Sequence, residues 1–123
     1  RIKNGSKEKL KLGNMKAKRD WGHAKDFVEA MWLMLQRDNP GDYVVGTGEE
    51  HSVDEFAKKA FAHVGLNYKD HIVIDQKLMR PAEVDSLLAD SSKAKKILKW
   101  EPKTSFDDLV INMVEHDLKI FKQ

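Results

Sequence analysis

Two arginines stand in short segments whose composition suits them to hold an anionic ligand. Arg19 lies within residues 18–23, a Lys-Arg-Asp-Trp-Gly-His run, and Arg80 opens residues 80–85, an Arg-Pro-Ala-Glu-Val-Asp run. A planar guanidinium binds phosphate oxygens through two parallel hydrogen bonds, so two arginines from separate loops could hold a diphosphate. Pro81 favours an extended backbone at Arg80, which directs its side chain away from its own turn.

A structural interpretation of the same arginines stays open at this point. Arg19 could pair with Asp20 or Asp85, and Arg80 with Glu83, as ion pairs on the surface. Such pairs contribute little to stability and would leave neither arginine available to a ligand. The residue types and their spacing do not choose between the two interpretations.

Other kinds of chemistry find little support in the sequence. It has no cysteine, which excludes a disulfide scaffold, a thiolate metal site and a cysteine nucleophile. No two of its five histidines have the i, i+4 spacing of a helical zinc site, so we predict no metal. Residues 46–48 form a Gly-Thr-Gly loop without the third glycine of a dinucleotide fingerprint or the lysine of a P-loop, which favours a tight turn. We therefore find no complete set of catalytic residues.

Charge is distributed unevenly along a chain of ordinary globular composition, 41% hydrophobic and 34% charged. Residues 1–25 hold nine lysines or arginines and two acids, whereas the remainder holds thirteen bases and eighteen acids. A basic front end could face nucleic acid, a phosphorylated ligand or solvent. No apolar stretch is long enough to cross a bilayer, so we expect no membrane segment, and the cytoplasm is the default compartment.

The elements that would position these residues alternate between strand and helix. Period-two alternation predicts a strand at residues 9–12, and apolar runs predict a buried strand at 43–48 and a second short strand at 71–75. Capping residues and helical spacing predict helices that begin near Ala24, at Ser52 with Glu55, at Asp90 or Ser91, and at Ser105 with Asp108. The pattern is that of a mixed α/β chain with more helix than strand.

The helix predicted over residues 24–36 is apolar on nearly all sides. Phe27, Val28 and Met31 belong to one stripe, while Leu33 and Met34 occupy most of the opposite face. A helix of this kind must be covered from several directions. A chain of 123 residues has little material for that, so the pattern points to a partner outside it.

Taken in order, these segments resemble the extended short-chain dehydrogenases/reductases, and within them the GDP-mannose 4,6-dehydratase family. The resemblance rests on an Ala-Lys-Arg-Asp-Trp-Gly-His-Ala segment at 17–24, a Glu-Ala-Met-Trp-Leu-Met-Leu segment at 29–35, and Arg-Pro-Ala-Glu-Val at 80–84. A Leu-Gly-Asn segment at 12–14 and an Asp-to-Pro stretch at 90–102 also match. The similarity covers essentially the whole chain.

The resemblance implies a role for each candidate residue. Arg19 and Arg80 would hold the diphosphate of GDP-mannose, and Glu83 would contact the ribose or an arginine. The strand edge with Lys11, Leu12 and Asn14 would offer backbone groups to guanine. The family's Tyr-x-x-x-Lys pair has no counterpart, because Tyr43 is followed by Thr47 and Tyr68 by Ile72 at the lysine position. No catalytic residue is therefore expected in this part.

The resemblance also implies an organisation and a set of partners. The chain would be the C-terminal, substrate-binding part of an NADP-dependent dehydratase, with NADP held by an N-terminal half outside it and a dimer or tetramer as the assembly. Residues 1–23 would supply a strand and a phosphate-binding loop, 24–48 would dock on the nucleotide-binding Rossmann sheet, and 49–123 would form the substrate-binding domain. Two alternatives stay open: another sugar-nucleotide epimerase or reductase of the same family, and a small basic nucleic-acid-binding module that uses Trp21 for stacking.

Overall fold

The computed structural model describes residues 1–121, and it contains four α-helices and five short strands within that range. Two single-turn 3-10 helices, η1 and η2, flank the fourth strand. The elements follow one another as β1 (Leu10–Leu12), β2 (Lys18–Arg19), α1 (Ala24–Leu35), β3 (His51–Ser52), α2 (Val53–His63), η1 (Tyr68–Asp70), β4 (Ile72–Ile74), η2 (Gln76–Leu78), β5 (Ser86–Leu87), α3 (Ser92–Leu98) and α4 (Phe106–Ile120).

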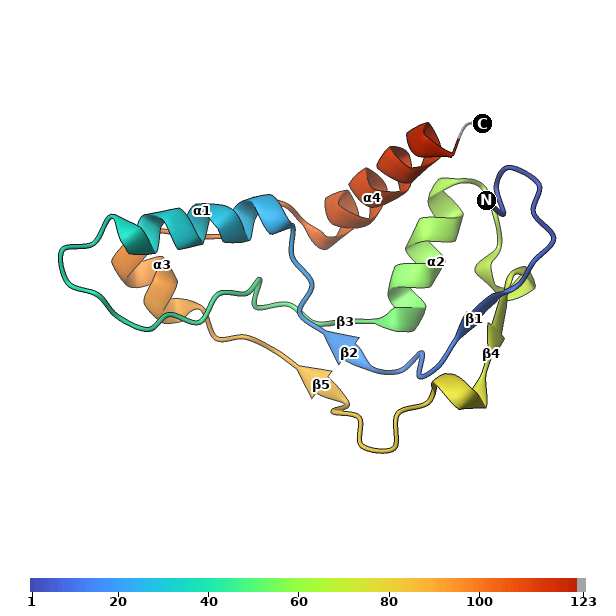
Figure 1. Ribbon diagram of the computed structural model, residues 1–123, viewed down its shortest axis with the longest axis horizontal. Coiled ribbons are helices and arrows are strands. Elements are labelled where there is room, and N and C mark those ends of the chain that lie inside the picture. The colour runs from blue at the N-terminus through green and yellow to red at the C-terminus, as the bar shows by residue number, and fades with distance from the viewer. Residues whose placement is uncertain (122–123) are drawn as a thin grey trace.

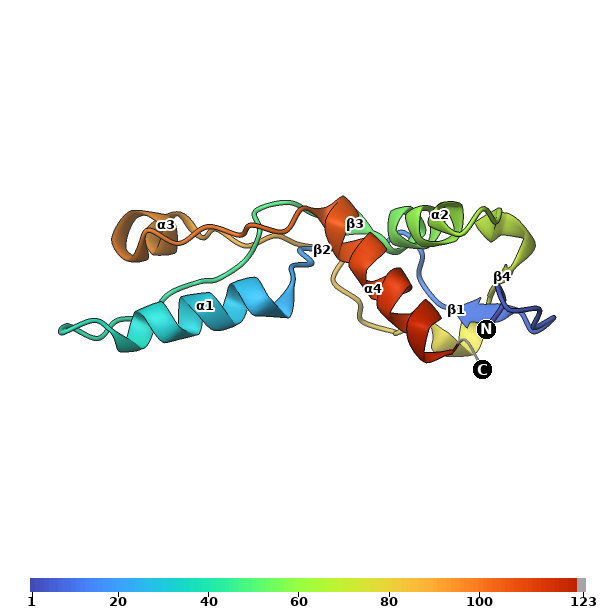
Figure 2. The same ribbon diagram turned by 90° about the horizontal axis from the view of Figure 1, so that it is seen from above.

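The molecule is elongated, with helices at both ends and a small sheet between them (Figure 1). Strands β1 and β4 form a parallel pair, while β2 lies between β3, which is antiparallel to it, and β5, which is parallel. We call the end with α1 and α3 the α1–α3 lobe, and the end with α2, α4, β1 and β4 the α2–α4 lobe. Figure 2 shows α1 and α3 in separate layers, with the outer side of α1 open.

The core of the α1–α3 lobe is small and centres on Trp100. Ala30 of α1 and Ala94 of α3 are fully buried against it, and Leu98 completes the cluster. The Trp100 indole donates a hydrogen bond from Nε1 to the Asp26 carbonyl over 2.9 Å, which satisfies its polar group inside the core. Alanines on the facing sides of the two helices allow this close approach.

Asp26 attaches the segment after Trp100 to the start of α1. Its carboxylate, 5% exposed, accepts hydrogen bonds from the backbone N–H groups of Lys103 at 3.1 Å and Thr104 at 2.9 Å. Burial by itself would raise the pKa of Asp26, but the hydrogen bonds from Thr104 and Lys103 and the charge of His23 outweigh it, so the pKa is lowered. The ionised carboxylate is thus part of the fold of this lobe.

In the α2–α4 lobe, the apolar sides of two helices pack on each other. Ala57 of α2 is buried, as are Phe106, Leu109 and Val110 in the first turns of α4. The predicted N-caps are present, because Ser52 Oγ accepts from Glu55 N–H and Ser105 Oγ accepts from Asp108 N–H, both over 3.1 Å. The Glu55 carboxylate does not complete a capping box but lies 3.1 Å from His51 Nδ1.

The sequence-based predictions of the elements are confirmed for the helices and for the strands at 9–12 and 71–75, to within one or two residues. The predicted strand over 43–48 is not formed. A strand requires a hydrogen-bonded neighbour, and no described segment pairs its backbone with residues 43–46. The short strands β2, β3 and β5 were not predicted, because two residues are too few to show a period.

Candidate functional site

Arg19 lies at the centre of the three-stranded sheet and is held from the β5 side. Its guanidinium donates to the carbonyl oxygens of Lys18 at 2.6 Å and Val84 at 2.8 Å, and to the Glu83 carboxylate at 3.2 Å. Both charged side chains of the Arg19–Glu83 pair are about one-fifth exposed, at 22% and 18%. A guanidinium has five N–H donors, and three hydrogen bonds leave two for an outside acceptor.

This pair differs from both partners suggested by the sequence. Arg19 does not pair with Asp20 or Asp85, and within residues 1–121 no ion pair or side-chain hydrogen bond involves Arg80. Arg80 is exposed in the loop that joins η2 to β5, the loop that also carries Glu83. The structure therefore brings Arg19 and Glu83 together and leaves the guanidinium of Arg80 available.

Asp20, next to Arg19, connects the three segments around the site. Its carboxylate accepts hydrogen bonds from Thr47 N–H at 2.8 Å, Gly48 N–H at 2.9 Å and Ala89 N–H at 3.2 Å, and from the Thr47 hydroxyl at 2.5 Å. Partial burial alone would raise the pKa of Asp20, but these hydrogen bonds outweigh it and lower the pKa. From the sequence, Asp20 was considered as a possible surface ion-pair partner for Arg19. Its hydrogen bonds to the loop at residues 46–48 were not predicted.

The Gly-Thr-Gly loop is a tight turn, as predicted, and its N–H groups are already in use. Gly48 has a φ of +79°, and a Cβ added at Gly46 would meet the Ala89 Cβ at 2.3 Å. Asp20 occupies the position in which a phosphate would accept from Thr47 and Gly48. This loop is therefore no cradle for a cofactor phosphate.

The edge of β1 has free backbone groups at Lys11. Leu10 N–H donates to His71 and Leu12 C=O accepts from Asp75, both over 2.8 Å, so the ladder to β4 uses residues 10 and 12. Alternation along the strand turns the N–H and C=O of Lys11 away from β4. Asn14 closes the following turn, with Oδ1 accepting from Lys16 N–H at 2.9 Å.

Aromatic rings fill the space between the site and the α2–α4 lobe. Trp21 lies edge-on to Phe56 with ring centroids 5.3 Å apart, and stacks on Phe106 at 6.1 Å. His51 stacks on the same Phe106, at 3.7 Å and an interplanar angle of 5°. Trp21 is thus committed to internal packing, which argues against a role in stacking nucleic-acid bases. Sequence reasoning gave His51 no role, since its partners come from distant positions.

No group of three or more histidines or acids in residues 1–121 could hold a metal ion. No helix in this range is both long and apolar enough to span a membrane. His63 and His116 lie beside Glu115 and Asp117, with nitrogen–oxygen distances of 2.7 and 3.3 Å.

Comparison with known proteins identifies the family. Residues 1–113 match the family model described as GDP-mannose 4,6 dehydratase. The chain belongs to the GDP-mannose 4,6-dehydratase family. It is 56% identical over all 123 residues to GDP-mannose 4,6 dehydratase 1 of Arabidopsis thaliana, and 47% identical to the human GDP-mannose 4,6 dehydratase over 96% of its length. The chain spans only about a third of each of these relatives, 34% and 36% respectively.

Solved structures place this family member among sugar-nucleotide enzymes by fold. A dTDP-glucose 4,6-dehydratase from Bacillus anthracis in complex with NAD superposes with a TM-score of 0.81 over 94% of the chain and 36% of that structure, at 24% identity. A UDP-glucose 4-epimerase from Thermotoga maritima with UDP-glucose gives 0.80 over 92% and 36%, at 27% identity. The predicted fold class, part of an extended short-chain dehydrogenase/reductase, is confirmed.

Proposed function

We propose that the chain is the substrate-binding part of a GDP-mannose 4,6-dehydratase, which converts GDP-mannose to GDP-4-keto-6-deoxy-mannose. The observation that carries this proposal is the family match over residues 1–113 together with relatives of that name at up to 56% identity. We use "full-length protein" for the longer polypeptide to which this part would belong. Its task there is to hold GDP so that the sugar reaches catalytic residues that lie outside this chain.

The diphosphate would bind between the Arg19 and Arg80 side chains. Arg19 retains two N–H donors and is fixed in orientation by Glu83, while Arg80 is exposed and can move to a ligand. The exposed Lys11 of β1 adds positive charge that attracts the anion, whereas Lys18 of β2 is paired with Glu50 at 3.1 Å. Glu83 can either keep Arg19 oriented or accept from the ribose hydroxyls.

Guanine would be recognised along the open edge of β1. Lys11 N–H and C=O face away from β4, and a purine with both donor and acceptor groups can hydrogen-bond to such an edge. Leu12 and Asn14 follow directly and shape the end of this edge. The base would therefore be selected by backbone groups and the diphosphate by side chains.

NADP would bind to the part of the full-length protein outside this chain. The Gly46–Gly48 loop does not fit the cofactor, because Thr47 and Gly48 donate to Asp20. The nicotinamide cofactors present in structures of the same fold support its use in the family reaction, since the dTDP-glucose dehydratase carries NAD. We place the enzyme in the cytoplasm as a dimer or tetramer.

The α1 helix and residues 43–47 would join the nucleotide-binding sheet of the full-length protein. Val28, Met31 and Trp32 on α1 are about 60% exposed, and Leu35 is 83% exposed, so this apolar face is uncovered. Residues 43–45 make no backbone–backbone hydrogen bond within the described part of the chain, so a neighbouring strand could satisfy their N–H and C=O groups. We propose that residues 24–48 belong to the sheet, residues 1–23 to the strand and phosphate loop, and residues 49–123 to the substrate domain.

The proposal is tested by calorimetry and product analysis on the full-length protein. We expect GDP-mannose to bind at least about ten-fold more tightly than UDP-glucose or a short single-stranded oligonucleotide, and NADP to support formation of the 4-keto product. Preference for UDP-glucose would point to another enzyme of the same fold, and preference for the oligonucleotide to a nucleic-acid-binding module. Either result would overturn the proposal.

A further inference from the structure

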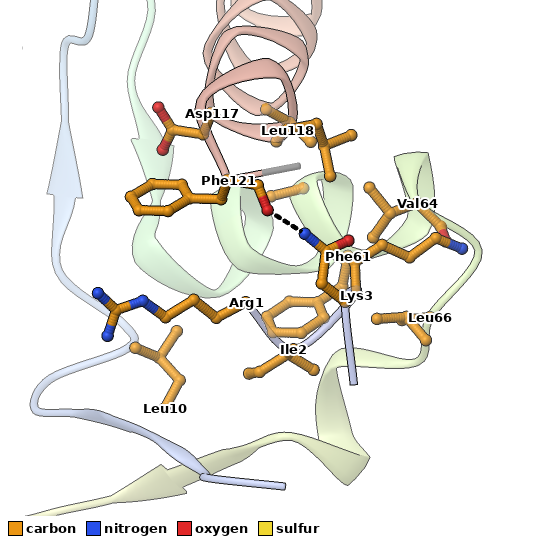
Figure 3. A pocket seen from close by; sticks show the side chains of 13 residues that line it. Arg1, Ile2, Lys3, Leu10, Phe61, Val64, Leu66, Asp117, Leu118 and Phe121 are labelled. Atoms are coloured by element: carbon orange, nitrogen blue, oxygen red, sulfur yellow. Dashed lines mark hydrogen bonds between the residues drawn. The ribbon is translucent and has the colours of Figure 1, made fainter. Parts of the chain in front are cut away.

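A polar network joins the three strands of the sheet that carries Arg19. Its members are Lys18 of β2, Ser86 of β5 and Glu50, which directly precedes β3. Figure 1 shows β2 between the other two strands, so the Glu50 side chain reaches across it. The network is separate from the apolar cavity of about 390 Å³ in the α2–α4 lobe, drawn in Figure 3, because none of the described residues that line this cavity belongs to the sheet.

Each oxygen of the Glu50 carboxylate accepts one hydrogen bond. The Ser86 hydroxyl donates to Oε2, and Lys18 Nζ donates to Oε1 over 3.1 Å. The hydrogen bond from Ser86, and after it that from Lys18, lower the pKa of Glu50, so this partly buried carboxylate is ionised at neutral pH. An ionised carboxylate binds a hydroxyl and an ammonium more strongly than a neutral acceptor does. Glu50 thus ties β5 to β2 from the opposite edge of the sheet.

Ser86 directly follows three residues that accept hydrogen bonds from β2. The Arg19 guanidinium donates to the Glu83 carboxylate at 3.2 Å and to the Val84 carbonyl at 2.8 Å. The Asp85 carbonyl accepts from a backbone N–H of β2 at 2.8 Å. A shift of β5 along β2 would therefore change how the Arg19 guanidinium is held.

A carboxylate from another segment holds β5 at each of its ends. Asp20 accepts from Ala89 N–H at 3.2 Å beyond the strand, whereas Glu50 accepts from Ser86 on the side of the loop that carries Arg80. The strand itself pairs with β2 through only two residues. Without the Glu50 carboxylate, side-chain support on the loop side of β5 is reduced, and the loop can move relative to β2.

We propose that Glu50 is a positioning residue for the diphosphate site and fixes residues 80–85 against β2. It is not itself a ligand-binding group, and it acts by keeping these residues in place relative to Arg19. Holding binding groups in place before the ligand arrives reduces the ordering that binding requires, so affinity rises without a new contact. The inference rests on the proposed function, because it needs Arg19 and Arg80 to bind the diphosphate.

Calorimetry with GDP on the full-length protein tests the inference through two truncations. We expect Glu50→Ala and Ser86→Ala each to weaken GDP binding about three- to ten-fold, because each removes a hydrogen bond to an ionised carboxylate. Ser86→Thr keeps the hydroxyl and should bind GDP as wild type does. Glu49→Ala is the matched control, since the Glu49 side chain is 72% exposed and lies beside His51, away from β5.

Steady-state kinetics and a double variant distinguish positioning from a general effect on the fold. Glu50→Ala should raise KM for GDP-mannose by the same factor as the loss of GDP affinity, with kcat and NADP binding unchanged. The Glu50→Ala/Ser86→Ala double variant should bind GDP within about two-fold of either single variant, because both substitutions break the same hydrogen bond.

Arg80→Ala, measured alongside, separates failure of the inference from failure of the proposed function. If Arg80→Ala weakens GDP binding while Glu50→Ala and Ser86→Ala stay within about two-fold of wild type, the inference is overturned and the diphosphate site stands. Unchanged affinity in Arg80→Ala would overturn the diphosphate site and the inference with it. Equal losses of GDP and NADP affinity, or additive effects in the double variant, would also overturn the inference. Circular dichroism confirms that each variant is folded.

Discussion

In the α1–α3 lobe, the uncovered apolar side chains project from an open helix face, whereas in the α2–α4 lobe they line a groove. Trp32 and Leu35 belong to the projecting face, and Leu10 and Phe61 to the groove. A projecting face suits a broad surface such as a sheet, while a groove between two helices and a strand suits a further helix. The two lobes are therefore suited to different partners. The sheet with Arg19, and the loop with Glu83, lie between them.

The strongest way to test this comparison uses the two tryptophans of the α1–α3 lobe. Trp100 is 2% exposed and Trp32 is 59% exposed. Trp100→Ala should lower the free energy of unfolding of the 123-residue chain by about 3–5 kcal/mol, because it leaves a cavity between α1 and α3. Trp32→Ala in the same chain should change it by about 0.5 kcal/mol or less. Urea denaturation followed by circular dichroism gives both values, and similar costs would contradict the assignment of core and open face.

The same Trp32→Ala substitution should lower the free energy of unfolding more strongly in the full-length protein than in the 123-residue chain. If a sheet covers α1 there, removing the indole should cost about 2–4 kcal/mol. Lys58→Ala, on the exposed side of α2, is the control and should have little effect in either form. An unchanged small cost for Trp32→Ala would mean that the α1 face stays open in the complete molecule.

Asp26 gives the α1–α3 lobe a dependence on pH. Asp26→Ala leaves the Lys103 and Thr104 N–H groups without their charged acceptor, so we expect a loss of about 1.5–3 kcal/mol at neutral pH. Because the folded-state pKa is lowered, the carboxylate stabilises the fold above the pKa of the unfolded chain, about 3.9, and this contribution disappears as the pH falls through the lower folded value.

The measurement is a comparison of wild type and Asp26→Ala by urea denaturation between neutral and acid pH. Their difference should shrink once the pH falls below about 4. Asp38→Ala, in an exposed turn, should follow wild type at every pH. If the difference in free energy of unfolding between wild type and Asp26→Ala stays constant through this pH range, the charge of Asp26 does not contribute to stability.

The smallest expected effect concerns one glycine from each lobe. Gly65, with a φ of +72°, ends α2, whereas Gly41 does not have a positive φ. Gly65→Ala should cost about 1 kcal/mol because alanine is strained in that conformation, and Gly41→Ala should be neutral or slightly stabilising. Thermal unfolding of both variants measures the difference, and equal midpoints would be inconsistent with the helix end described here.

Local signals were sufficient to predict most of the elements. Ser52 and Ser105 identified the starts of α2 and α4, because caps act within a few residues. The strand over 43–48 could not form without a neighbour, and Val44 of this segment is 56% exposed. The apolar excess of α1 likewise predicts a partner, and the structure leaves Val28, Met31, Trp32 and Leu35 exposed.

The candidate site was predictable in composition but not in its contacts. Arg19, Arg80 and Glu83 were selected from residue type and family resemblance, whereas the Arg19–Glu83 pair joins positions 64 residues apart. Asp20 was taken for a surface acid because its hydrogen-bond donors, the N–H groups of Thr47 and Ala89, come from two distant segments. Such long-range hydrogen bonds leave no periodic pattern in the sequence.

Arg80 provides the most direct test of the proposed diphosphate site. It makes no ion pair or side-chain hydrogen bond within the described part of the chain, so Arg80→Ala should leave the fold intact. Its loss removes charge-assisted hydrogen bonds to the diphosphate, worth about 1.5–3 kcal/mol, or about ten- to a hundred-fold in affinity. Arg80→Lys should recover only part of this, because an ammonium lacks the planar fork.

Calorimetry of GDP-mannose binding to the full-length protein decides the matter, with Lys58→Ala as the control for a lost surface charge. We predict binding weakened about ten- to a hundred-fold in Arg80→Ala and unchanged in Lys58→Ala. An Arg80→Ala affinity within about two-fold of wild type would contradict the account, because the guanidinium would then contribute little to the binding of GDP-mannose.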